Sequence, residues 1–167
     1  MKNIKVLVAA FITLSLLAVS CEEEEIVYGD WIRSSDFDGV SRSDGVAFSI
    51  NGNGYVCGGY DGKERLTDLW EYNADQDYWT QRADFPGTAR TSATAFELDG
   101  KGYVGTGYDG DSYLTDFWEY DPSTNLWTRL SDFAGGERSG AISFGLEGYG
   151  YLGTGYNGNF LKDMWKY

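Results

Sequence analysis

Three stretches of the sequence match one another without a gap: Trp31-Ile32-Arg33-Ser34-Ser35-Asp36-Phe37, Trp79-Thr80-Gln81-Arg82-Ala83-Asp84-Phe85 and Trp127-Thr128-Arg129-Leu130-Ser131-Asp132-Phe133. Successive stretches lie 48 residues apart. One arginine and three aromatic positions keep the same register: Arg42, Arg90 and Arg138; Phe48, Phe96 and Phe144; Tyr55, Tyr103 and Tyr151; Tyr60, Tyr108 and Tyr156. A period this long indicates one supersecondary unit that is copied in tandem.

Each unit has the pattern of four short strands. In the second copy we expect strands near residues 92–96, 103–107, 116–120 and 127–130. Asp99-Gly100 is a turn pair typical of hairpins, and Pro122 lies at a favoured turn position. Four short strands repeated at a period near 50 are typical of a propeller blade. The sequence supports no helix of useful length after residue 20, so the predicted fold class is all-β.

The unit resembles the kelch repeat. The family pattern has an arginine that opens the first strand, a Gly-Gly pair that closes the second, and Tyr-Asp-Pro with a tryptophan seven residues after the tyrosine. This chain has Arg138-Ser139-Gly140, Gly58-Gly59, and Tyr120-Asp121-Pro122 followed by Trp127. It departs from the pattern at Gly105-Thr106-Gly107, where the glycine pair is split. The resemblance covers residues 31–167 and implies a kelch-type β-propeller, a fold that galactose oxidase also contains as a domain.

The number of blades is small for a closed ring. The pattern begins with a lone fourth strand at Trp31, contains two complete copies, and ends with three strands at Tyr167. This amounts to about three four-stranded blades, whereas propellers usually have about four to eight. We therefore expect a partial ring that belongs to a longer protein, which we favour, or half of a larger ring in which two copies form a six-bladed homodimer.

The N-terminal residues have the pattern of an export signal. Lys2 and Lys5 precede an apolar run over residues 6–19, which is too short for a comfortable membrane span. The segment Leu17-Ala18-Val19-Ser20-Cys21 resembles the lipobox of bacterial lipoproteins, and the alternative is an ordinary signal peptide with a chance cysteine. The resemblance implies a signal peptide over residues 1–20, lipidation of Cys21 and a membrane anchor.

We interpret residues 21–30 as an acidic tether. Glu22 to Glu25 form a solvated acidic run, which also resembles the surface-export signals of Bacteroidetes-type lipoproteins. The expected location is the envelope of a Gram-negative bacterium, as an outer-membrane lipoprotein that is either periplasmic or surface-exposed. The propeller follows over residues 31–167.

The charge of the chain limits its partners. Without residues 1–20 the chain has 11 basic and 26 acidic residues, a formal charge of −15. Such a surface argues against nucleic acid and against an anionic membrane surface as partners. It is compatible with proteins, neutral glycans, cationic peptides or divalent cations.

Function is expected on one face of the propeller. The loops that join the fourth strand to the next blade and the second strand to the third share a face, and in the kelch family such loops commonly form the binding surface. Each arginine could instead bind carbonyl or carboxylate groups of its own blade. The ligand-binding candidates from the repeat are Arg42, Arg90, Arg138, Tyr60, Tyr108, Tyr156, Asp61, Asp109 and Asn157. The candidates that do not repeat are Lys63, Glu64, Arg65, Asp111, Tyr113, Asn159 and Phe160.

Catalysis has little support in the sequence. The chain has no histidine, which removes the commonest general base and metal ligand. The copper site of galactose oxidase uses histidines and cannot be built here, and no pair of acids stands apart from the repeat. Asp109-Gly110-Asp111 resembles the start of a calcium loop, but position 12 of that loop is Tyr120 rather than an acid. We therefore predict no catalytic residue, no metal site and no cofactor.

The favoured function is a non-enzymatic module that binds a protein or a glycan through the loop face. Two alternatives remain open. One is a partial propeller domain of a carbohydrate-active enzyme, such as an epimerase or an oxidoreductase. The other is a structural spacer in a truncated longer protein.

Overall fold

The computed structural model of the chain describes residues 29 and 31–167. The strands belong to a unit that covers Ser34–Tyr167. They form three antiparallel sheets, two of four strands and one of three. The predicted signal peptide, the lipidation site Cys21 and all of the acidic tether except Gly29 lie outside the described residues.

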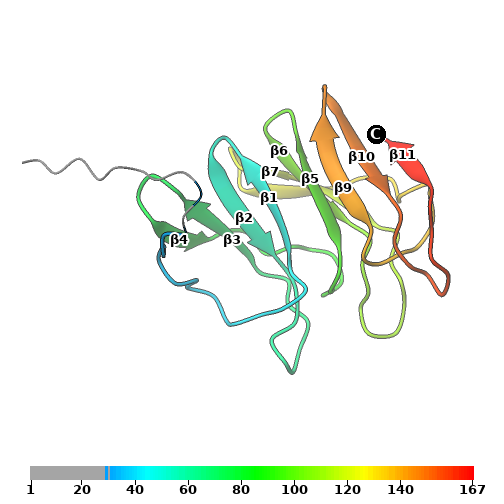
Figure 1. The fold of residues 1–167 in the computed structure, drawn as a ribbon, viewed down its shortest axis with the longest axis horizontal. Coiled ribbons are helices and arrows are strands. Elements are labelled where there is room, and N and C mark those ends of the chain that lie inside the picture. The colour runs from blue at the N-terminus through cyan, green and yellow to red at the C-terminus, as the bar shows by residue number, and fades with distance from the viewer. Residues whose placement is uncertain (1–28, 30) are drawn as a thin grey trace, which may run out of the picture. The chain divides into compact units, whose positions relative to one another are not determined.

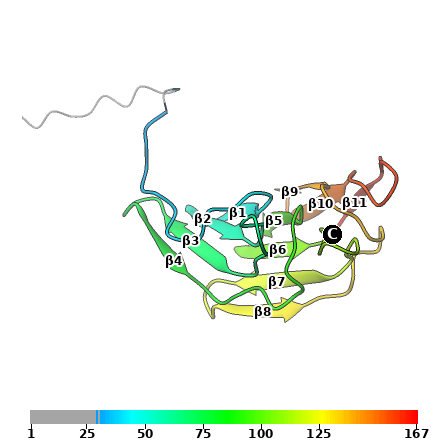
Figure 2. The same cartoon turned by 90° about the horizontal axis from the view of Figure 1, so that it is seen from below.

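Each sheet follows the chain in order, so each is one blade. Blade 1 contains β1 (Val46–Ile50), β2 (Asn53–Cys57), β3 (Leu69–Asn73) and β4 (Tyr78–Gln81). Blade 2 contains β5 (Thr94–Leu98), β6 (Lys101–Gly105), β7 (Phe117–Asp121) and β8 (Leu126–Arg129), and Figure 2 shows these four strands in sequence order. Blade 3 contains β9 (Ile142–Leu146), β10 (Tyr149–Gly153) and β11 (Met164–Lys166).

The first hairpin of every blade has the same tight turn. Its two central residues are Asn51-Gly52, Asp99-Gly100 and Glu147-Gly148, and all six have positive φ angles. This backbone matches the twist of the flanking strands, which is why glycine and asparagine or aspartate are favoured there. The predicted turn at Asp99-Gly100 is confirmed.

The hydrophobic cores lie between blades rather than within them. In the first core, blade 1 contributes the stacked rings of Phe48 and Tyr55, and blade 2 contributes Val104 and Tyr120. In the second core, the corresponding rings of blade 2 pack against Leu152 of blade 3. Because a blade buries its apolar face only against a neighbour, the stability of the array depends on stacking.

The structure confirms the all-β fold class and its partial-propeller character. The strands of blade 2 begin within two residues of their predicted positions. The predicted strand at Trp31 is wrong, since residues 31–37 form no strand and Trp31 is fully exposed. A strand needs a paired edge, and in the described part of the chain the fourth-strand place beside β11 is empty.

The connections between strands lie on two opposite sides of the sheets. Residues 58–68, 106–116 and 154–163 join the second strand to the third in each blade, and they lie along the lower side in Figure 1. The first hairpins of the blades lie along the upper side in Figure 1. Among the described residues, no helix is long and apolar enough to cross a membrane.

Candidate functional site

The three repeated arginines each bind a carboxylate of their own blade. Arg90 donates two hydrogen bonds of 2.7 Å to Asp116, and its Nη1 also donates to the Thr106 carbonyl. Arg42 contacts Asp68 in the same bidentate way, and Arg138 contacts Asp163. All three arginine side chains are buried.

The geometry assigns these arginines a structural role. Their guanidinium groups are shared between carboxylate and backbone oxygens, which uses the donors that a ligand would need. Asp68, Asp116 and Asp163 also recur in register, with one residue removed from the third loop. That recurrence is the sequence signal that could have identified the partners of Arg42, Arg90 and Arg138. We therefore leave the three arginines out of the proposed binding surface.

The carbonyl that each arginine holds belongs to a residue with left-handed backbone. These residues are Gly58, Thr106 and Thr154, with φ of 62°, 54° and 60°. A β-branched residue rarely adopts this conformation. The hydrogen bond from the arginine fixes that peptide, so the glycine pair of the repeat can be split at the second and third copies without loss of the loop.

The ion pairs also lower the pKa values of the three carboxyl groups. Burial raises the pKa of Asp68 and Asp116, but hydrogen bonds from an arginine and a tryptophan outweigh it and bring both below the ordinary value of 3.8. For Asp163 the hydrogen bond from Arg138 is the largest cause, and it lowers the pKa to about 2. The carboxylates are therefore ionised partners over a wide pH range.

The predicted loop face exists. Antiparallel bridges join Ser43 to Tyr60 and Thr91 to Tyr108, and the third blade has the equivalent bridge from Ser139 to Tyr156. Each bridge holds the segment that enters a blade against the loop between its second and third strands. The three tyrosines of the repeat are therefore brought to one side of the array.

An aromatic row crosses this face from blade to blade. We define the row as Tyr60, Arg65, Tyr108, Tyr113, Tyr156 and Phe160. The Arg65 guanidinium lies 5.8 Å from the Tyr60 ring centroid and 5.4 Å from that of Tyr108. Ring contacts of 5.3 Å, 5.9 Å and 5.1 Å then join the remaining members in sequence.

The row alternates repeated and variable positions. Tyr108 and Tyr113 form a bridge within one loop, and the same bridge joins Tyr60 to Arg65 and Tyr156 to Phe160. The second member of each pair therefore occupies one position, filled by Arg, Tyr or Phe. Those three residues are among the predicted non-repeating candidates, but the sequence did not indicate that Arg65 and Tyr113 would contact the tyrosine of the next blade.

Two rings of the row are exposed to solvent, and one polar atom of the row has no hydrogen-bond partner among the described residues. Phe160 is 90% exposed and Tyr156 is 37% exposed. The buried Arg65 Nε has no hydrogen-bond partner in the described part of the protein. A cation held by ring faces, together with exposed rings, suits the binding of flat or apolar groups.

The acidic candidates shape the loops beside the row. The Asp61 carboxylate accepts hydrogen bonds from the amides of Lys63 and Glu64, and Asp109 does the same for residues 111 and 112. These backbone hydrogen bonds lower the pKa of both aspartates. Asn157 accepts a longer one from the Asn159 amide. Asp61 is exposed and Asp109 half-buried, so both bring negative charge to the loop face.

Among residues 29 and 31–167, no group of three acidic or cysteine side chains is arranged to hold a metal ion. The one cysteine in this range, Cys57, is buried in the first core, and burial raises the pKa of its thiol to about 12. It therefore packs as a small apolar side chain.

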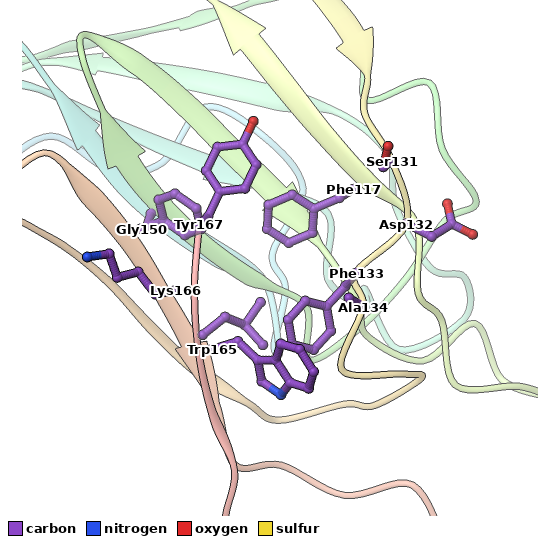
Figure 3. A pocket seen from close by; sticks show the side chains of 11 residues that line it. Phe117, Ser131, Asp132, Phe133, Ala134, Gly150, Trp165, Lys166 and Tyr167 are labelled. Carbon is purple, nitrogen blue, oxygen red and sulfur yellow. The ribbon is translucent and has the colours of Figure 1, made fainter.

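A separate apolar cavity of about 190 Å³ lies at the end of blade 3. Figure 3 shows Tyr167 and Phe117 on one side of it and Phe133 and Trp165 on another. It lies beside β11, away from the aromatic row. None of the predicted site residues lines it.

Comparison with known proteins agrees with the fold. The sequence profile of the kelch motif matches residues 41–86 and 89–134, which is more than half of the chain. The chain therefore belongs to the kelch-repeat family. No curated protein matches it. Kelch repeats generally mediate binding to other proteins and are typically binding modules rather than enzymes.

Proposed function

We propose that this protein is a non-enzymatic, lipid-anchored binding module of the bacterial envelope, and that the aromatic row is the centre of its recognition surface. The observation that carries the proposal is the continuous row of rings and one cation across three blades. Its variable positions are Arg65, Tyr113 and Phe160. Because the blade fold does not require a particular residue there, these positions are free to serve a ligand.

A protein segment with basic and aromatic residues fits this surface best. The acidic side chains beside the row and the charge of −15 would attract a cationic partner. Exposed ring faces would accept the partner's cations or aromatic groups. A neutral glycan could also stack on such rings, but it would gain nothing from the negative charge.

The binding proposal is tested with an array of synthetic peptides that combine lysine or arginine with aromatic residues, read alongside a glycan array. We expect salt-sensitive peptide binding that Tyr113→Ala weakens about fivefold or more. Tyr78→Ala is the matched control, because Tyr78 is an exposed tyrosine in β4, outside the row. Equal loss in both variants would exclude the row, and hits on the glycan array alone would overturn the choice of a protein partner.

Envelope anchoring is tested separately by labelling with a clickable fatty acid. The proposal expects label on the wild-type chain and none on Cys21→Ala. It also expects that variant to leave the membrane fraction. Label that persists on the variant would show that Cys21 is not the anchor.

A further inference from the structure

A polar cavity of about 420 Å³ lies in blade 2, beside the aromatic row. The segment that enters the blade lines it at Pro86, and the loop between β6 and β7 lines it from Tyr113 to Asp116. Tyr113 is also a member of the row, so the cavity adjoins the proposed recognition surface. Its volume lies within the range of about 300–1,000 Å³ that is usual for ligand pockets.

The cavity belongs to the blade that has a neighbour on each side. All of its lining residues lie in the range 86–137, in blade 2 and in the two segments that connect it to blades 1 and 3. Blade 2 packs against blade 1 in the first core and against blade 3 in the second. The shape of the cavity is therefore set by the described residues themselves.

Part of the lining recurs in the repeat, and part does not. Asp116 and Trp118 recur, with Asp68 and Trp70 as their equivalents in the first copy. Three other members of the lining differ between the second copy and the first: Tyr113 against Arg65, Arg129 against Gln81, and Glu137 against Ala89. Because a blade folds with either set, these three positions are free to serve a ligand.

The charges in the cavity leave one carboxylate without a partner. Asp116 is neutralised by its repeated arginine. Asp132 accepts a hydrogen bond of 2.6 Å from Arg129 and one of 3.2 Å from the Thr115 hydroxyl. Glu137 is exposed and has no hydrogen-bond or ion-pair partner among the described residues. The cavity therefore has an uncompensated negative charge, which favours a cation.

The aromatic part of the lining selects the kind of cation. Tyr113 and Trp118 both line the cavity, and the faces of such rings attract cations. An ammonium group is compact and strongly hydrated, whereas a guanidinium group is planar and more weakly hydrated. A guanidinium group can lie along a ring while its edge donates hydrogen bonds to carboxylates. This lining therefore favours a guanidinium over an ammonium group.

We propose that this cavity binds the guanidinium group of an arginine side chain. The ligand lies against Tyr113 and Trp118 and donates hydrogen bonds to Glu137 and Asp132. Arg129 and Asp132 are 55% and 51% exposed, and an exposed ion pair contributes little free energy, so the Asp132 carboxylate can be shared. The inference rests on the proposed function in one respect, since it assigns the arginine to the protein segment that the aromatic row binds.

Nuclear magnetic resonance of the purified full chain, titrated with acetyl-arginine amide, tests the cavity without a peptide partner. We expect saturable shifts of the Trp118 indole N–H and of the backbone amides of residues 113–116. Acetyl-citrulline amide has nearly the same shape without the charge, and we expect no saturable shifts with it. The absence of shifts with the arginine probe, or equal shifts with both probes, would overturn the proposal.

Two variants of the lining should change the affinity for acetyl-arginine amide in opposite directions. Glu137→Gln removes the unpaired charge and should weaken binding about threefold. Arg129→Gln removes the competing cation and should strengthen binding about twofold, a gain that a misfolded chain would not show. Glu147→Gln, the same change on the exposed hairpin of blade 3, is the control and should have no effect. Unchanged binding by Glu137→Gln, or weaker binding by Arg129→Gln, would contradict the proposal.

The failure of this inference can be told apart from the failure of the proposed function. If acetyl-arginine amide binds in the cavity but no basic peptide on the array binds, the cavity stands and the choice of a basic peptide partner is wrong. Phe160 belongs to the row and does not line the cavity. If Phe160→Ala weakens peptide binding and Glu137→Gln does not, the row stands and the cavity is not the arginine site.

Discussion

Blades 2 and 3 have nearly the same sequence pattern but very different surroundings. Phe96 of blade 2 is buried, whereas its equivalent Phe144 is exposed. The bidentate ion pair between the repeated arginine and its aspartate, in contrast, has the same geometry in both blades. The repeat therefore carries two kinds of residue, those that complete a blade from within and those that need a neighbour.

The largest effect is expected where a neighbour covers the ring. Phe96→Ala should destabilise the chain by about 3–5 kcal/mol, because it leaves a cavity between blades 2 and 3. Phe144→Ala should cost less than about 1 kcal/mol, because that ring is 43% exposed. Urea unfolding of both variants measures the difference, and equal losses would break the comparison.

Loss of the arginine–aspartate pair should destabilise blades 2 and 3 by more similar amounts than loss of the phenylalanine does. Asp116→Ala leaves the Arg90 charge buried and should cost about 3 kcal/mol, at the low end for a buried pair because the carboxylate is partly exposed. Asp163→Ala leaves Arg138 in the same position but with a more exposed partner, so its loss should be smaller. Thermal unfolding of the two variants decides this, and an Asp163→Ala chain as stable as wild type would contradict a structural role.

The same pairs predict how stability depends on pH. The folded-state pKa of Asp163 is about 2, below the ordinary value of 3.8, so its contribution is complete above about pH 4 and is lost as the pH falls towards 2. Asp163→Ala should therefore flatten the loss of stability over this range. Urea midpoints collected between pH 5 and pH 2 test the expectation, which an unchanged pH profile would exclude.

The smallest effect concerns backbone strain. Thr154→Gly should stabilise the chain by about 1 kcal/mol, since glycine adopts its left-handed conformation without strain. Thr106→Gly should gain less, because the buried Thr106 hydroxyl lies 3.2 Å from that of Thr94, and this contact would be lost. Melting temperatures of the two variants provide the test, and a gain at Thr106 equal to that at Thr154 would show that this contact does not matter.

Much of the fold could be predicted from the sequence because a strand depends on local patterns. The hairpin pair Asp99-Gly100 and the 48-residue register located the strands of blade 2 within two residues. Trp31 was predicted to begin a strand from its register alone. Strand formation also needs a paired edge, and register carries no information about whether that edge is present.

The candidate site was less predictable because it forms between blades. Tyr60, Tyr108 and Tyr156 could be identified from their recurrence. Tyr113 could be identified only as a residue that does not repeat, and its ring contact with Tyr156 depends on how blades 2 and 3 stack. How two blades stack depends on the side chains that pack between them, and a single sequence does not show which of these side chains meet.

The central claim is that a blade is stabilised mainly by its neighbours: blade 2 contributes to both hydrophobic cores, whereas Ile142, Phe144 and Leu146 of blade 3 are exposed. Hydrogen exchange of backbone amides, followed by mass spectrometry, tests this most directly. We expect weaker protection of β9, β10 and β11 than of β5, β6 and β7, because one face of blade 3 is exposed. Equal protection of blades 2 and 3 would contradict it.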